Sequence, residues 1–226
     1  MDATHPTATV EDYLQAIYSL EGEGDTVISA RLARRMHVTP PTAWATVRRM
    51  VRDGLVELDG RKVVRLTPKG HDLAEDITRR HRLAERFLVD VMGLGWAEAH
   101  EEAHQFEHAI TPRLYDKIME LAGNPKTCPH GSPIPGTGYR LSPDLQPLGS
   151  LKADDEASVV FISEELEEDQ ELMKYLERSK MMPGGKLRVI ETSPSTGVMV
   201  VERDGQNVPL GLAVAAKIRV KAKTAE

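Results

Sequence analysis

The chain of 226 residues lacks several features that would point to particular classes of protein. It has one cysteine, Cys128, which excludes an intramolecular disulfide framework and is typical of a reducing compartment. No apolar run approaches the roughly 18 residues that a membrane-spanning helix needs. The N-terminus shows no basic region followed by an apolar stretch, as a signal peptide would. We therefore expect a cytoplasmic protein with no membrane partner.

The sequence also lacks the motifs of several enzyme classes. It has no Gly-rich phosphate loop, no nucleophile elbow and no internal repeat. Its length allows one large domain or two small ones, with enough core to fold without disulfides. We expect neither an enzyme nor a small organic substrate.

The net charge of −6 hides a strong segregation along the chain. Residues 1–30 carry six acidic residues and no Lys or Arg, whereas residues 31–82 carry 13 Lys and Arg against 6 Asp and Glu. Residues 83–226 are acidic again, with 23 Asp and Glu against 16 Lys and Arg. A basic segment inside an acidic chain is typical of a nucleic-acid-binding module.

The basic segment has the pattern of a winged helix-turn-helix. Thr39 followed by Pro40 is typical of an N-cap and the first position of a helix. Asp59-Gly60 between two alternating runs predicts a β-hairpin. The expected elements are helices over 10–20, 29–36 and 39–52 and strands over 55–58 and 63–66. An arbitrary α+β domain is the alternative, but it would not explain why arginines gather around the third helix.

The remaining chain predicts further helices followed by a small sheet. Residues 122–149 hold six Pro and five Gly, a composition typical of a linker outside the core. The short strands beyond it predict a small β-barrel of SH3-like size. The expected elements are helices over 68–92, 95–110 and 112–121, a strand over 157–162, a helical stretch over 164–177, and strands over 186–191, 197–203, 206–210 and 216–222.

Residues 100–108 are unusually rich in metal-capable side chains. On one helix, where each residue advances by about 100°, four of these side chains share a stripe about 100° wide. The stripe consists of His100, His104, Glu107 and His108. It adjoins an apolar sector, where imidazoles and carboxylates are costly unless something coordinates them. The spacing therefore predicts a metal site, with a solvated His-rich helix face as the alternative.

The same stretch matches the H-E-x-x-H signature of zinc metalloproteases through His100, Glu101 and His104. This pattern is weakly specific in a Glu-rich helix, and Glu107 and His108 add two more donors to the same face. A hydrolytic zinc usually has three protein ligands and an open position. A zinc metallohydrolase is therefore a remote alternative, and we expect a metal that is held rather than one that reacts.

Several short segments share their residues with a known family. They are Glu11-Asp12-Tyr13-Leu14, Ile17-Tyr18, Asp53-Gly54-Leu55-Val56, Thr67-Pro68-Lys69-Gly70, His81-Arg82-Leu83-Ala84-Glu85, Glu107-His108 and Cys128–Gly136. Through them the chain resembles the metal-dependent transcriptional regulators typified by the diphtheria toxin repressor and the manganese transport regulator. The resemblance covers nearly the whole chain and is most specific over residues 10–136.

The resemblance implies a mainly α fold with β structure in three parts. Residues 1–70 would form a winged helix-turn-helix DNA-binding domain, and residues 71–140 a helical metal-binding and dimerisation domain. Residues 141–226 would form an SH3-like small β-barrel, with a linker at about 122–149. The implied protein is a metal-activated homodimer that binds a palindromic operator in double-stranded DNA and represses metal-uptake genes. A metal-independent winged-helix regulator with a structural metal is the alternative.

The resemblance also implies two metal sites. The primary regulatory site falls on Asp12, His104, Glu107 and His108. The ancillary site falls on His81, Glu85 and His100, and counting back from Gly184 adds Glu164 and Glu167, in a run of acids where a solvated face is the alternative.

Two positions of the primary set depart from the family and bear on the choice of metal. Iron-type members use Met where Asp12 stands and Cys where His104 stands, whereas manganese-type members use Asp and then a carboxylate. The hard oxygen of Asp12 favours Mn(II) first and Fe(II) next, with other divalent transition metals binding in vitro. Cys128, in its Pro-rich loop, has no second Cys as a partner, and we expect a loop residue rather than a ligand.

Residues of the third helix are the expected DNA contacts. Its first turns would read base edges and its later arginines would meet phosphates. The base-reading set is Thr39, Pro41, Thr42, Trp44 and Ala45, with a core position as the alternative for Trp44, and the phosphate-binding set is Arg48, Arg49 and Arg52.

Overall fold

The computed structural model describes residues 6–223, so the outermost residues of the expected first and third domains lie outside the described part. The chain divides into two compact units, which we describe separately. The first comprises the chain up to His81 together with Glu107–Ile110. The second comprises Arg82–Phe106 and the chain from Thr111 onward. Within the described residues, no helix combines the length and the apolar character that crossing a membrane requires.

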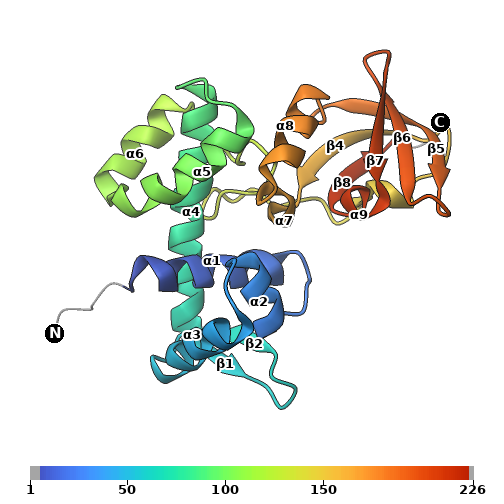
Figure 1. The fold of residues 1–226 in the computed structure, drawn as a ribbon. Helices are drawn as coiled ribbons and strands as arrows, with labels where there is room; N and C mark the ends of the chain where they lie inside the picture. The colour runs from blue at the N-terminus through green and yellow to red at the C-terminus, as the bar shows by residue number, and fades with distance from the viewer. Residues whose placement is uncertain (1–5, 224–226) are drawn as a thin grey trace. The chain divides into compact units, whose positions relative to one another are not determined.

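The first unit contains the winged helix-turn-helix that the sequence predicts (Figure 1). Its elements are α1 (Ala8–Gly22), α2 (Ser29–Arg35), α3 (Pro40–Arg52), β1 (Val56–Leu58), β2 (Val64–Leu66) and the beginning of α4 (Pro68–Asp90). The two strands pair antiparallel, with Val56 opposite Leu66. Leu14, Ile17 and Leu32 are fully buried in its core. Apolar spacing along the helices therefore produced the expected core.

The local sequence explains where α3 and α4 begin. Thr39 caps α3 by accepting a hydrogen bond from the Thr42 N–H at 3.4 Å. At the start of α4, Thr67 Oγ1 donates to the Gly54 carbonyl at 2.7 Å. Here Gly70 packs so closely that a Cβ would lie 1.9 Å from the Leu55 carbonyl oxygen. A side chain at this position would force the helix away from the wing.

The second unit contains the rest of α4, then α5 (Trp96–Phe106) and α6 (Pro112–Leu121). Glu177, from the C-terminal part of the chain, caps α5 by accepting hydrogen bonds from the Trp96 N–H at 3.2 Å. The expectation of one continuous helix over 95–110 is wrong at its end. α5 ends at Phe106, and the chain tightens into a 3₁₀ turn, η1 (Glu107–Ala109), which belongs to the first unit.

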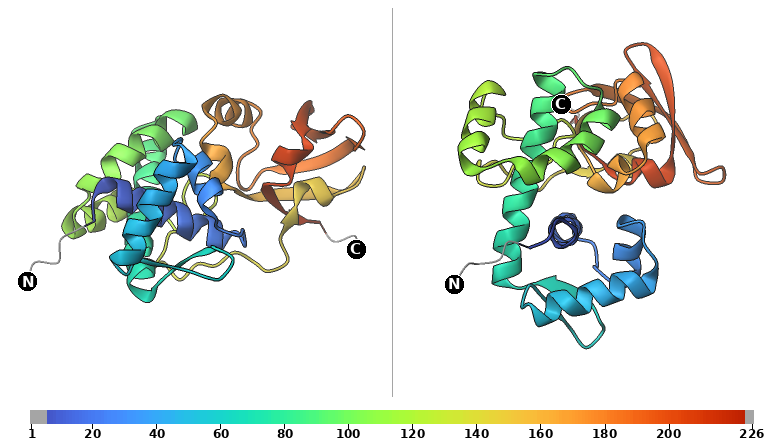
Figure 2. Two further views of the ribbon diagram at one scale, coloured as in Figure 1. Left: turned by 60° about the horizontal axis from the view of Figure 1, so that its bottom comes forward. Right: turned by 60° about the vertical axis from the view of Figure 1, so that its left-hand side comes forward.

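An antiparallel sheet with small helices forms the C-terminal part of the second unit, which confirms the SH3-like prediction (Figure 2). The strand order is β3-β8-β4-β5-β6-β7. The elements are β3 (Gln146–Pro147), η2 (Leu148–Ser150), β4 (Glu156–Ile162), α7 (Glu164–Glu167), α8 (Gln170–Arg178), β5 (Lys186–Ser193), β6 (Val198–Arg203), β7 (Gln206–Gly211), α9 (Leu212–Ala215) and β8 (Ile218–Ala222). Register shifts in β4 and β5 are bulges that help such a sheet to curve.

Three details of this sheet differ from the sequence prediction. The helical stretch expected over 164–177 is divided into α7 and α8, because Asp169 starts a new helix by capping the Leu172 N–H at 3.0 Å. The short β3 and α9 were not expected, since neither is long enough to show a periodic pattern.

The Pro- and Gly-rich segment expected to be a linker has a buried portion. Cys128, His130 and Ile134 are all buried. Arg86 donates hydrogen bonds to the carbonyls of residues 127 and 128, and Arg82 donates to the carbonyl of residue 133. Gly131 adopts a φ of +96°, and a Cβ there would lie 2.1 Å from the Val160 carbonyl oxygen. This loop is therefore fixed between α4 and β4, although its composition is that of a linker.

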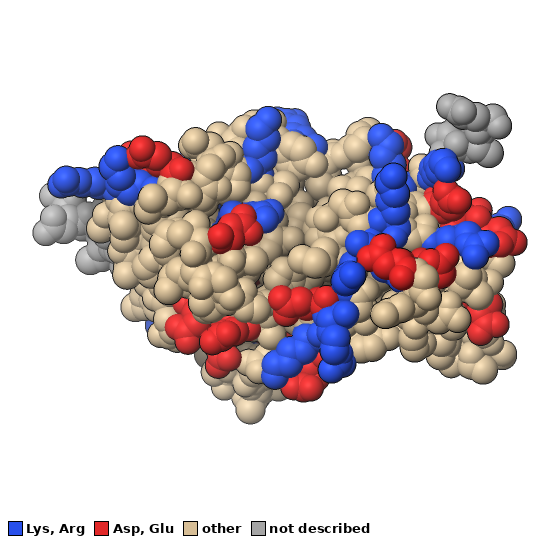
Figure 3. Space-filling model, turned by 90° about the horizontal axis from the view of Figure 1, so that it is seen from above, with Lys and Arg blue, Asp and Glu red and all other residues tan. Residues whose placement is uncertain are grey.

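Several surface charges of the second unit lie in pairs of opposite sign. On the face drawn in Figure 3, Lys and Arg side chains lie beside Asp and Glu. Exposed pairs such as Lys174–Glu171 at 3.0 Å and Lys223–Glu156 at 2.8 Å are screened by solvent and contribute little to stability. The DNA-binding prediction therefore rests on the basic segment of residues 31–82, which contains α3.

Candidate metal centres and DNA-binding helix

Three predicted ligands meet in the first unit: Asp12 from α1, and Glu107 and His108 from η1. His108 Nε2 lies 3.5 Å from Asp12 Oδ1 and 3.6 Å from Glu107 Oε1. One ligand atom from each residue lies within 4.8 Å of the other two. Because metal–ligand bonds are about 2 Å long, these atoms need only small shifts to share one ion. We call these three residues the Asp12 group.

The electrostatics of the Asp12 group fit a bound cation. Glu107 is fully buried, and its Oε1 accepts no hydrogen bond from the described residues. Burial, together with the nearby negative charge of Glu107, raises the pKa of Asp12 to about 6. Two carboxylates held this close are unfavourable without a positive charge between them. A divalent ion with oxygen and imidazole ligands would supply that charge.

His81 lies beside the Asp12 group rather than apart from it. Its Nδ1 is 2.5 Å from Glu107 Oε2, and both side chains are buried. The resemblance implies that His81 belongs to the ancillary set, and within the first unit its imidazole also contacts Glu107, a predicted primary ligand. Glu107 therefore has His81 at one carboxylate oxygen and faces His108 with the other.

A second group of metal-capable residues is buried in the second unit. His100 Nδ1 lies 2.8 Å from Glu85 Oε1 and 3.3 Å from Glu167 Oε2. His130 Nδ1 lies 3.1 Å from Glu167 Oε1, and Cys128 Sγ is 3.9 Å from the same nitrogen. We call these five residues the Glu167 group. The structure thus brings three predicted ancillary ligands, Glu85, His100 and Glu167, into one cluster.

The sequence does not predict a role for His130, and it predicts that Cys128 is a loop residue rather than a ligand. Both are fully buried, and with Glu85 they form a set whose ligand atoms lie within 4.8 Å of one another. The Cys-Pro-His spacing was the signal, but a lone Cys in a Pro-rich loop is rarely a ligand. Only the fold of the loop against α4 reveals the cluster.

The imidazoles of the Glu167 group are held in their charged form. Burial lowers the pKa of His100, but hydrogen bonds to Glu167, Glu168 and Glu85 outweigh it and raise the pKa well above its usual value. Burial likewise lowers the pKa of His130, and the charges of Glu167 and Glu85 raise it by more. Two imidazolium groups therefore balance the two carboxylates. A metal ion would have to displace these protons.

The remaining predicted ligands lie near the two groups but have other contacts. Glu164 Oε1 accepts a hydrogen bond from Arg82 Nε at 2.7 Å, and the ligand clusters found among the described residues do not include Glu164. His104 lies on α5 in the second unit, where its ring packs edge-on against His100 with 4.8 Å between the centroids.

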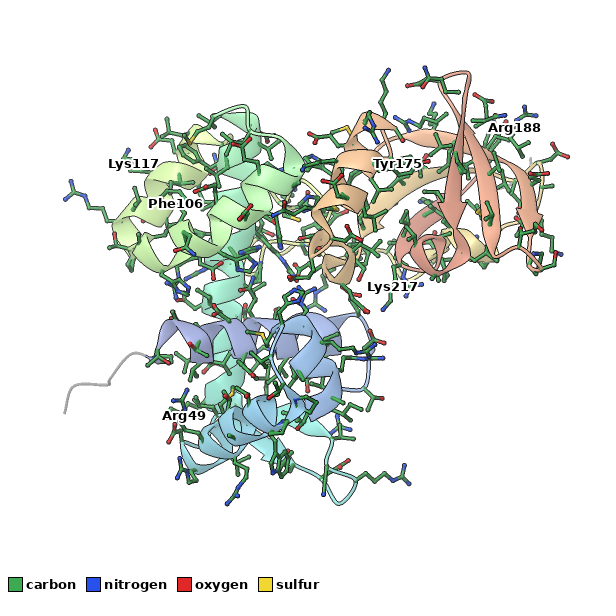
Figure 4. The ribbon with its side chains drawn as sticks, viewed as in Figure 1. Arg49, Phe106, Lys117, Tyr175, Arg188 and Lys217 are labelled. Carbon is green, nitrogen blue, oxygen red and sulfur yellow. The ribbon has the colours of Figure 1, made fainter. Side chains whose placement is uncertain are left out.

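The predicted DNA-contact residues share the exposed side of α3. Thr39, Pro41, Thr42, Ala45, Arg48 and Arg52 are exposed, and Arg49 is half-buried. Arg49 extends from α3 (Figure 4) and lines a groove with Arg48, Arg52, Trp44 and Leu58. Trp44, for which the sequence allows either a DNA contact or a core position, is intermediate between the two. It is half-buried against the core, and Lys62 Nζ lies 5.8 Å from its ring centroid. α3 therefore presents polar side chains first and arginines later.

The H-E-x-x-H stretch lacks the geometry of a hydrolase. Glu101, which would be the general base, is exposed and accepts a hydrogen bond from Gln170 Nε2 at 2.8 Å. His100 is engaged by the carboxylates of the Glu167 group. The pattern therefore arises from a Glu-rich helix face.

Comparison with known proteins agrees with this reading. Three family models match: "Iron dependent repressor, N-terminal DNA binding domain" over residues 5–64, "Iron dependent repressor, metal binding and dimerisation domain" over residues 67–136, and "FeoA domain" over residues 146–222.

Similar proteins match over almost their whole length. The iron-dependent repressor IdeR of Mycobacterium tuberculosis is 39% identical, with 94% of this chain and 96% of the relative covered. The diphtheria toxin repressor of Corynebacterium efficiens is 34% identical, with 94% and 95% covered. A solved structure of a manganese-dependent transcriptional repressor in complex with manganese has a TM-score of 0.82 at 34% identity, covering 93% of this chain and 98% of the other. The chain therefore belongs to the iron-dependent repressor family of metal-activated, DNA-binding transcriptional repressors, which are not enzymes.

Proposed function

We propose that this protein is a manganese-activated repressor whose regulatory ion binds at the Asp12 group. The observation that carries the proposal is the convergence of Asp12 and Glu107 oxygens on His108 Nε2. Mn(II) lies at the weak end of the divalent affinity order, so a protein selects it by hard ligands and geometry. Two carboxylates provide those ligands, and Fe(II) ranks next. His104 is the fourth proposed ligand, on the strength of the family resemblance alone.

A bound ion would supply positive charge that holds α1 against η1. Asp12 is part of α1 in the DNA-binding region, whereas Glu107 and His108 follow directly on α5. Binding would thus fix the first helix of the winged helix-turn-helix to the segment that ends the metal-binding helix. In a homodimer, this selects one spacing of the two α3 helices and so raises affinity for DNA with two matching half-sites.

We further propose that the Glu167 group, with His81 and Glu164 as the other proposed ancillary ligands, holds a second ion that stabilises the second unit. The partners of the protein are a second copy of the chain and a palindromic operator in double-stranded DNA. The proposed targets are metal-uptake genes, and the protein works in the cytoplasm, where a repressor meets its DNA.

The decisive experiment titrates metal-free protein with Mn(II), Fe(II), Co(II) or Zn(II) under anaerobic conditions and follows operator binding. We expect Mn(II) to activate binding at the lowest free-metal concentration. A metal-independent regulator with a structural metal would bind equally with and without added ion, and a much stronger response to Fe(II) would reverse the proposed preference.

The double variant Asp12→Met with His104→Cys should shift activation away from Mn(II), because it replaces an oxygen and an imidazole with softer sulfur ligands.

Metal affinity should depend on pH through Asp12. The pKa of Asp12 is about 6 in the folded, metal-free protein, compared with its ordinary value of 3.8. Protonated Asp12 therefore stabilises the metal-free fold relative to ionised Asp12. This contribution is fully present below pH 3.8 and is lost as the pH rises through about 6. Mn(II) requires the carboxylate, so affinity should rise by up to about tenfold per pH unit in this window and then level off. Asp12→Asn should bind Mn(II) more weakly, and its affinity should not show this rise with pH. An identical profile would show that another group controls it.

DNA recognition should divide along α3. Arg49→Ala should weaken binding to all DNA sequences and reduce the slope of log affinity against log salt by about one, as expected when one phosphate contact is lost. Thr42→Ala should instead reduce discrimination between operator and unrelated DNA. Fluorescence anisotropy at several salt concentrations measures both. Arg178→Ala, on α8, is the control, and an unchanged slope for Arg49→Ala would remove this residue from the contact set.

A further inference from the structure

Consecutive residues of α1 contact the two ring nitrogens of His108. Glu11 Oε2 lies 2.8 Å from Nδ1, and Asp12 Oδ1 lies 3.5 Å from Nε2. Glu107 Oε1 also faces Nε2, at 3.6 Å. The side of the ring that carries Nδ1 is therefore turned toward a carboxylate outside the Asp12 group, and the side that carries Nε2 is turned toward the proposed metal ligands.

Glu11 is itself oriented by Arg80. Arg80 Nη2 lies 3.4 Å from Glu11 Oε1, while Nη1 donates to the Glu107 carbonyl at 3.2 Å. Arg80 also pairs with Asp76 at 2.9 Å. The side chains of Glu11 and Arg80 are only 13% and 15% exposed. The two oxygens of Glu11 thus face different partners, His108 on one side and a guanidinium on the other.

We propose that Glu11 is a positioning residue that makes Nε2 of His108 the metal-binding nitrogen. The inference rests on the proposed function of the Asp12 group. A neutral imidazole carries its proton on either nitrogen, and the hydrogen bond at one nitrogen decides which is left to bind a metal. Glu11 accepts the proton of Nδ1, so the lone pair stays on Nε2. A carboxylate behind a ligating imidazole also makes that imidazole a stronger donor.

The same contacts keep Glu11 out of the ligand set. Glu11 and Asp12 are neighbours on α1, and either carboxylate has the chemistry to bind a hard divalent ion. Asp12 faces Nε2 and Glu107, whereas Glu11 faces the opposite nitrogen and Arg80. The site therefore keeps two ligating carboxylates rather than three, and Glu11 acts through His108.

The test compares wild-type protein with Glu11→Gln and Glu11→Ala. The control is Glu75→Gln, which changes a carboxylate that lies 3.7 Å from His71 on α4 of the same unit, with the side chains of His71 and Glu75 52% and 41% exposed. Mn(II) affinity is measured by competition with a chelator on the full-length chain. Unfolding of the metal-free proteins reports any purely structural effect. Nitrogen-15 NMR of His108 with Zn(II), a diamagnetic ion, identifies the metal-bound nitrogen.

We expect Glu11→Ala to weaken Mn(II) binding by about 10- to 100-fold, as is usual when the partner of a ligating His is removed. Glu11→Gln should lose less, because the amide oxygen still accepts the Nδ1 proton. In wild type we expect Nε2 to bind Zn(II) and Nδ1 to be protonated, and Glu11→Ala should lose this preference. Glu75→Gln should match wild type throughout.

Two results would overturn the inference. One is wild-type Mn(II) affinity in Glu11→Ala. The other is equal loss of metal-free stability in both Glu11 variants with the nitrogen preference of His108 unchanged, which would make the contact merely structural. Failure of the proposed function would look different, because wild-type protein itself would then show no activation by Mn(II).

Discussion

Asp12→Ala should abolish metal-activated operator binding while the protein stays folded. The substitution removes one oxygen ligand and one negative charge, so Mn(II) affinity should fall at least about tenfold. The metal-free protein should lose no stability, because the raised pKa of Asp12 shows that its carboxylate form is disfavoured where it lies. Operator binding against free Mn(II), together with thermal unfolding with and without the ion, measures both effects.

Asp72→Ala is the matched control, since it removes an exposed carboxylate of α4 in the same unit. His104→Ala tests the fourth proposed ligand in the same assay. If Asp12→Ala still responded to Mn(II) at the wild-type concentration, the Asp12 group would not be the regulatory site.

Glu167→Ala should destabilise the metal-free protein by about 3 kcal/mol, the scale expected when one member of a buried ion pair is deleted. Glu167 is fully buried between His100 and His130, and its charge helps to raise the pKa of both. A raised imidazole pKa contributes stability below about pH 6.5 that is lost as the pH rises through the folded-state value. The deficit of the variant should therefore be largest at or below pH 6.5 and shrink at higher pH.

Chemical denaturation of chelator-treated protein at several pH values measures this deficit. Glu171→Ala is the control, because its side chain is 87% exposed and belongs to the same acidic run. Stabilisation by added metal in the second unit should also be reduced in Glu167→Ala. A deficit that is small and independent of pH would contradict the ion-paired description of the Glu167 group.

Much of the fold could be predicted because its signals are local. Thr39 and Pro40 mark the start of α3, and Asp59-Gly60 lies in the turn of the wing. Each signal depends on residues within a few positions, so a single sequence is enough to read it. The division into a winged helix-turn-helix, a helical part and an SH3-like part followed from these patterns and from the family resemblance.

The parts that could not be predicted depend on tertiary contacts. A helical wheel put Glu107 and His108 on the same stripe as His100, but the chain tightens into η1 and separates them from α5. Likewise, composition marked residues 122–149 as a linker, because Pro and Gly report local conformation and not burial. Contacts to His130 come from Trp96 of α5, Ile162 of β4 and Glu167 of α7, which are distant in sequence.

The buried loop has a consequence for proteolysis. Arginine side chains of α4 hold its carbonyls, and Ile162 N–H donates to the carbonyl of His130 at 2.9 Å, so residues 128–135 are sequestered from an enzyme that must bind extended backbone. Residues 138–140 and 142–144, by contrast, are exposed. Trypsin should therefore nick the chain after Arg140, and the N-terminal fragment would carry the whole Cys128–Pro133 loop with it. Cleavage near residue 122, where the Pro- and Gly-rich composition begins, would instead leave the N-terminal fragment without that loop.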